Sequence, residues 1–153
     1  MPRKSLPDID SADVPQAPNL ARIRAVLTSI ADGASTLERI AEETDISARH
    51  VGYAVRAAQA LELLDRGRAP TPRGSALLAT PQESDAERDA LRLAIEESVI
   101  LRALAPTLLS PKPPTKKALG ARIEKLSGLS TATAEHRASD LLAWREQILE
   151  EEG

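Results

Sequence analysis

Five arginines cluster between residues 47 and 73, namely Arg49, Arg56, Arg66, Arg68 and Arg73. Only two carboxylates, Glu62 and Asp65, fall in the same segment, so five positive charges against two negative ones leave it at +3. A guanidinium group presents a planar fork of N–H donors that fits phosphate oxygens and the edge of guanine. The cluster therefore indicates contact with nucleic acid. A solvated helix surface or a contact with another protein is the alternative explanation.

The first two arginines lie in a segment with helical periodicity. Ser47 is a typical N-cap residue, and Val51, Val55 and Ala58 follow at the spacing of a buried helix face. The other side of this helix carries the remaining polar and small side chains. They include Arg49, Gly52, Tyr53 and Arg56.

The pattern changes after Leu61, where L-L-D-R-G-R-A-P-T predicts two very short strands around a glycine turn. Arg66, Gly67 and Arg68 would then form the tip of a small β-hairpin. Thr71 as N-cap with Pro72 at the first helical position begins the next helix, which includes Arg73.

The elements that must position these residues are mainly helices. The chain has 26 Ala and 21 Leu, against one Trp, one Tyr and no Phe, and this composition favours helices over sheets. Periodicity and capping signals predict further helices starting after Asn19, Ser35, Ser84, Thr115 and Ser130. We expect the helix after Ser84 to run unbroken to Leu104. The four prolines of residues 106–115 predict a stiff connection. Gly128 is predicted to end the helix that starts after Thr115.

The motifs T-L-E-R-I-A-E-E-T-D-I-S-A-R-H-V-G-Y-A-V (36–55) and L-E-L-L-D-R-G-R-A-P-T-P-R-G (61–74) resemble the winged helix-turn-helix family of bacterial DNA-binding proteins. The resemblance covers residues 19–80. It implies that the helix after Ser47 lies in the major groove. The residues that would contact DNA from this helix are Ser47, Arg49, His50, Gly52, Tyr53 and Arg56. The segment with Arg66, Gly67, Arg68 and Arg73 would reach phosphate or the minor groove.

A second helix-turn-helix pattern appears in G-L-S-T-A-T-A-E-H-R-A-S-D-L-L-A-W (128–144). Residues 84–150 resemble C-terminal helical segments of restriction-associated and ATPase-associated bacterial proteins. The positions that hold the arginines in the first motif are Ala132 and Ser139 in the second, and a carboxylate, Glu135, has been gained. This half has the outline of a DNA-binding unit without its arginines.

Three segments follow from these patterns. Residues 1–18 hold four prolines and no periodicity, and are predicted to be a disordered arm. Residues 19–80 are predicted to be a winged helix domain, and residues 81–153 a helical domain like a helix-turn-helix. The predicted fold class is mainly α, with one small β-hairpin.

Several classes of function are disfavoured. The chain has no cysteine, and its two histidines are not at metal-ligand spacing, so no metal site is expected. No nucleophile elbow, phosphate loop or dinucleotide motif is present, and we expect neither an enzyme nor a bound cofactor. No segment has the apolar length of a membrane span, and the first residues lack a signal-peptide core. A cytoplasmic protein without a membrane contact is predicted.

The second half carries more apolar side chains than its own core stripe requires. A surplus of this kind is normally buried against another chain. We therefore predict a homodimer or a larger complex formed through residues 84–150, with an interface that includes Leu93, Ile100, Leu101, Leu104, Trp144 and Leu149.

The predicted function is sequence-specific or structure-specific binding of double-stranded DNA. The resemblances suggest a small bacterial transcriptional regulator, or an accessory factor of a DNA-processing or defence system. The alternative is a non-enzymatic adaptor that uses both lobes to dock protein partners.

Overall fold

The structure, a computed structural model, describes residues 9–149, and within this range it contains helices and no strand. The first element is a short 3-10 helix, η1 (Ser11–Asp13). The α-helices are α1 (Leu20–Ala31), α2 (Leu37–Thr44), α3 (Ala48–Ala60), α4 (Pro72–Leu78), α5 (Asp85–Glu97), α6 (Val99–Leu104), α7 (Lys116–Ser127) and α8 (Thr131–Leu149). The mainly α class is confirmed.

Local capping signals determine where most of these helices begin. The side chain of Ser47 accepts a hydrogen bond from the His50 N–H at 3.3 Å, and Thr71 accepts one from the Gly74 N–H at 3.0 Å. Gly128 ends α7 with a left-handed φ of 78°. One predicted cap is wrong by a residue, because Thr36 and not Ser35 caps α2.

The predicted β-hairpin is not formed, so the winged-helix class is wrong for this chain. A single bridge pairs Leu64 with Pro70, and no ladder extends from it. Leu63 and Leu64 are both buried, whereas consecutive residues of a half-exposed strand alternate between core and solvent. Residues 63–71 therefore form a closed turn between α3 and α4.

The predicted helix over 84–104 is interrupted at Ser98. The Ser98 side chain is fully buried, donates to the Ala60 carbonyl at 2.7 Å and accepts from the Leu101 N–H at 3.0 Å. It therefore caps α6 as a separate helix while binding the C-terminal end of α3. This break directs Leu101 and Leu104 into the protein's own core.

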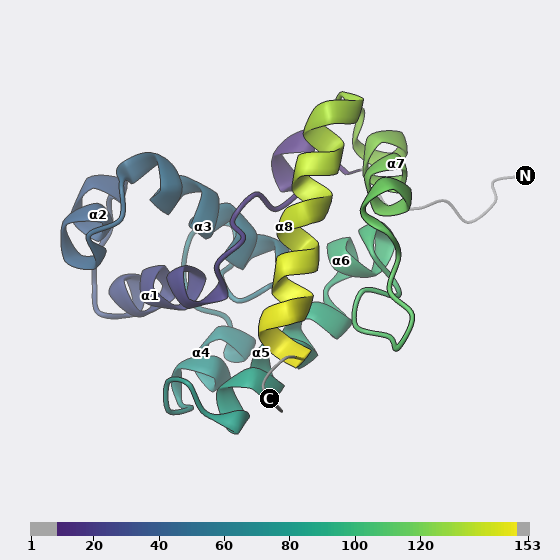
Figure 1. Cartoon of the computed structure of the whole chain (residues 1–153). Helices are drawn as coiled ribbons and strands as arrows, with labels where there is room; N and C mark the ends of the chain where they lie inside the picture. Colours follow the sequence, from purple (N-terminus) through teal and green to yellow (C-terminus); the bar gives the residue numbers. More distant parts are fainter. Residues whose placement is uncertain (1–8, 150–153) are drawn as a thin grey trace, which may run out of the picture.

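Figure 1 shows α8 standing between two groups of helices, with α1 to α3 on one side and α6 and α7 on the other. The first three helices pack against one another, and α7 lies along α8. The backbones of α7 and α8 approach closely at Gly120, where an added Cβ would be 2.7 Å from the Cγ of Glu135. Buried side chains from both predicted domains join in one hydrophobic cluster.

The segment before α1 packs onto this frame. Val14 and Ala17 are buried, and the Ala17 carbonyl accepts a hydrogen bond from the indole nitrogen of Trp144 at 2.7 Å. Figure 1 shows the segment running along α8 toward the start of α1. The prediction of disorder is therefore wrong for residues 9–18, and its remaining part, residues 1–8, lies outside the described range.

Candidate nucleic-acid interface

The exposed side of α3 carries a stripe of three residues, Arg49, Tyr53 and Arg56, at helical spacings of four and three. Arg49 and Arg56 are exposed and Tyr53 is half-buried. The opposite side of α3 buries Val51 and Val55, which fixes the direction of the stripe.

Contacts within the stripe pre-arrange its first turn. The Nε of Arg49 donates to the Tyr53 hydroxyl at 2.8 Å, and this hydrogen bond is the main reason why the pKa of Arg49 is raised. The ring of His50 meets that of Tyr53 edge-on, with 5.7 Å between the ring centroids. Arg49 therefore stays cationic and is held in one orientation at the surface.

Two further exposed arginines lie on the turn after α3. The turn is closed by Asp65, whose carbonyl accepts from the Arg68 N–H at 3.0 Å and whose carboxylate accepts from the Ala69 N–H at 2.9 Å. Arg66 lines a groove of about 590 Å³ together with Arg56 and Gln59 of α3. The turn thus lies next to the second half of the stripe, as the predicted wing would have done.

We define the arginine face as Arg49, Arg56, Arg66 and Arg68. Within residues 9–149, none of its guanidinium groups has a carboxylate oxygen within 4.0 Å. Arg73, the fifth predicted arginine, differs. Its guanidinium pairs with Glu62 at 3.2 Å and with Glu97 at 2.7 Å, so it joins three segments and is not part of this face.

The remaining predicted contact residues have mostly structural positions. The Ser47 hydroxyl is occupied by the cap of α3 and by the Nδ1 of His50 at 2.8 Å. Gly52 faces α2, since an added Cβ would meet Leu37 at 3.9 Å, so it does not provide a close approach on the exposed side. Gly67 is exposed in the turn, but the left-handed φ of 68° falls on Arg68.

Sequence reasoning missed the residues that face the first turn of α3 from elsewhere in the chain. A cavity of about 430 Å³ is lined by Arg49, His50 and Tyr53 of α3, and also by Arg22 of α1 and by His136 and Asp140 of α8. His136 is exposed and lies within the second helix-turn-helix pattern of residues 128–144. Nothing in the sequence indicated that α8 lies beside α3.

The predicted oligomer interface is largely wrong. Leu101, Leu104 and Trp144 are buried within the chain, and Ile100 and Leu149 are partly buried against the same core. Leu93 is the one member of the set that is strongly exposed, at 49%. The break at Ser98 and the packing of residues 9–18 cover the surface that was assigned to a partner.

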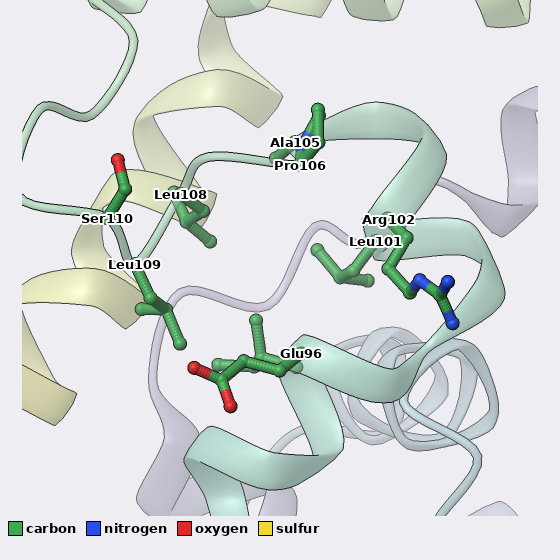
Figure 2. A pocket seen from close by; sticks show the side chains of 9 residues that line it. Glu96, Leu101, Arg102, Ala105, Pro106, Leu108, Leu109 and Ser110 are labelled. Atoms are coloured by element: carbon green, nitrogen blue, oxygen red, sulfur yellow. The ribbon is translucent and has the colours of Figure 1, made fainter.

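A second cavity of about 430 Å³ lies between α5, α6 and the connection after α6. Figure 2 shows Leu101, Leu108 and Leu109 around the open space, with Glu96 and Arg102 on different sides of it. Its polar groups do not converge on one point, so it is a weaker candidate site than the arginine face.

No protein-family model matches the sequence, and neither a search of curated proteins nor a search of solved structures finds a match. Among the described residues, no helix is both long enough and apolar enough to cross a membrane.

Proposed function

We propose that the protein binds double-stranded DNA through the arginine face. The observation that carries the proposal is the contrast between these four exposed guanidinium groups, which have no ion pair within residues 9–149, and Arg73, which is held by two carboxylates. Guanidinium groups without an internal ion pair keep N–H groups that can contact phosphates and base edges.

The dimensions of α3 suit a DNA groove. Arg49 and Arg56 lie on one face of α3, and an α-helix with its side chains is about 10–12 Å in diameter. The major groove of B-DNA is about 12 Å wide and admits an α-helix. We assign the α3 stripe to base edges and the 65–68 turn to phosphates.

A salt-dependent titration of labelled genomic DNA fragments, followed by fluorescence anisotropy, tests the proposal. Wild-type affinity should fall steeply as salt rises, because phosphate contacts release counterions. Arg49→Ala or Arg56→Ala should cost about 1–3 kcal/mol of specific binding if the lost arginine pairs with a guanine.

Arg102→Ala is the matched control, because Arg102 is exposed on α6 and does not line the groove beside α3. Its DNA affinity should equal that of the wild type. Unchanged affinity in both α3 variants would refute the assignment of α3. Absence of salt-dependent binding by the wild type would favour the protein adaptor instead.

The biological setting belongs to the proposal as well. A DNA-binding chain of this size fits a bacterial transcriptional regulator or an accessory factor of a DNA-processing or defence system.

A further inference from the structure

The cavity between α1, α3 and α8 brings together hydrogen-bonding groups from three helices that are distant in the sequence. Its volume of about 430 Å³ lies in the range of small-molecule sites. Both histidines of the chain line it, His50 from α3 and His136 from α8. Arg22 of α1 and Arg49 of α3 add two guanidinium groups.

The residues that line this cavity keep hydrogen-bond donors that are not used by contacts within the described part of the protein. Neither Arg22 nor Arg49 has a carboxylate within 4.0 Å in residues 9–149. The Tyr53 hydroxyl accepts from Arg49, which leaves its own proton to donate. The Nδ1 of His50 meets Ser47, which leaves Nε2. N–H and O–H groups of this kind, with two fixed positive charges, suit an oxyanion.

One lining residue has the opposite character. Asp140 is 7% exposed, and no described residue donates a hydrogen bond to its carboxylate. Burial is the main influence on Asp140 and raises its pKa, against the lowering effect of His136 and Arg137. The oxygens of this carboxylate are not among the fully buried atoms, so they can accept a hydrogen bond from a molecule in the cavity. An oxyanion that carries its own proton could supply one.

We infer that this cavity binds hydrogen phosphate, held by Arg22, Arg49 and His136 and donating its P–OH to Asp140. A DNA phosphodiester has no such proton, so this site is separate in chemistry from the proposed phosphate contacts of the 65–68 turn. Sulfate has the same shape but carries no proton at neutral pH, and Asp140 should reject it.

Titration of the full-length protein with inorganic phosphate and with sodium sulfate tests this inference. Calorimetry gives the affinities, and NMR signals of the two histidine rings show where the anion binds. Phosphate should shift the His136 signals and bind at least tenfold more tightly than sulfate. Equal binding of the two anions, or phosphate binding without a shift at His136, would overturn the inference.

Substitutions separate the residues that bind the anion from the residue that selects phosphate over sulfate. Arg22→Ala and His136→Ala should each weaken phosphate binding about tenfold or more, since each removes a hydrogen bond to a charged group. Asp140→Asn should reduce the difference in affinity between phosphate and sulfate. Arg102 does not line this cavity, so Arg102→Ala should change neither affinity. Circular dichroism verifies that each variant is folded. Wild-type affinities in the first two variants would contradict the site.

A competition experiment extends the test, and this arm alone rests on the proposed DNA binding. The cavity and the arginine face share Arg49, so phosphate should weaken DNA binding more than sulfate does at equal ionic strength. If the protein does not bind DNA, the calorimetric arm still decides whether phosphate binds. If the protein binds DNA and phosphate weakens this binding no more than sulfate does, then Arg49 does not belong to both sites.

Discussion

Three arginines outside the arginine face have guanidinium groups that contact other segments of the fold. Arg122 donates to the Ala103 carbonyl at 2.7 Å, and Arg145 donates to the Ser110 carbonyl at 2.6 Å. The guanidinium of Arg24 is buried and contacts Glu87 at 2.7 Å. These side chains satisfy polar groups at the ends of helices and in connections. Their substitution should affect folding, whereas substitution in the arginine face should affect binding.

Gly74 shows how closely one residue can constrain the packing of a helix. A Cβ built at Gly74 would be 2.1 Å from the carbonyl oxygen of Leu63, because the first turn of α4 lies directly on the turn after α3. We predict that Gly74→Ala lowers the free energy of unfolding by about 1–3 kcal/mol or more, as the backbone must move apart. Urea denaturation followed by circular dichroism measures the change.

Gly67→Ala is the matched control for this substitution. Gly67 is exposed, and an added Cβ would be 3.4 Å from the Asp65 carboxylate, near ordinary contact distance. Its unfolding curve should stay close to that of the wild type. Equal stabilities for the Gly74 and Gly67 variants would show that α4 can shift away from Leu63 at no cost.

At the scale of elements, the junction between α3 and α4 determines where the arginine face points. Glu62 follows the C-cap of α3 with a left-handed φ of 63°, a position that favours glycine. Its carboxylate compensates by pairing with Arg73 and accepting from the Val99 N–H at 3.1 Å. One residue thus joins the end of α3 to α4 and to the start of α6.

The turn after this junction provides a test in which stability and binding move in opposite directions. Arg68 has a left-handed φ of 68°, which is unfavourable for a residue with a Cβ. Arg68→Gly should raise the free energy of unfolding by about 1 kcal/mol. It should also flatten the salt dependence of DNA binding by roughly one unit of slope, because one phosphate contact is lost.

Arg66→Gly is the control in the same turn, because the left-handed φ values of the described residues do not include Arg66. It should flatten the salt dependence equally but should not stabilise the protein. Thermal denaturation and salt titration of both variants give the comparison. A stability gain in both variants, or in neither, would contradict the assignment of the strain to Arg68.

At the scale of the whole molecule, Trp144 holds the segment before α1 against α8. Its side chain is fully buried, and its indole N–H bonds the Ala17 carbonyl. Trp144→Phe keeps a ring but leaves that carbonyl without its donor, so we predict a loss of about 1–3 kcal/mol in the free energy of unfolding. Hydrogen exchange of the Val14 amide, which donates to the Ser11 carbonyl within this segment, should become faster than in the wild type.

Leu93→Ala serves as the comparison. Leu93 is 49% exposed, so its substitution should leave hydrogen exchange in that segment unchanged. Unaltered protection of the Val14 amide in Trp144→Phe would mean that other contacts hold the segment. The predicted homodimer stays a prediction, and the apolar side chains of its proposed interface that remain open to a partner are Leu93 and, in part, Ile100 and Leu149.

The sequence by itself determined the elements whose signals are local. Caps such as Ser47 and Thr71, the stop at Gly128 and the periodicity of α3 predicted helix positions, because these contacts join residues within one or two helical turns. The stripe of Arg49, Tyr53 and Arg56 followed from the same periodicity. These features need no knowledge of what packs against the helix.

Only the tertiary structure decided what covers each apolar or polar face. The apolar surface of Leu101, Leu104 and Trp144 is equally suited to a partner chain or to the chain's own core, and contacts such as Ser98 to Ala60 select the core. The single bridge in place of a hairpin, and the meeting of α8 with α3 at the phosphate site, depend likewise on contacts between distant segments. Periodicity shows which face is buried, but it carries no information about the surface that buries it.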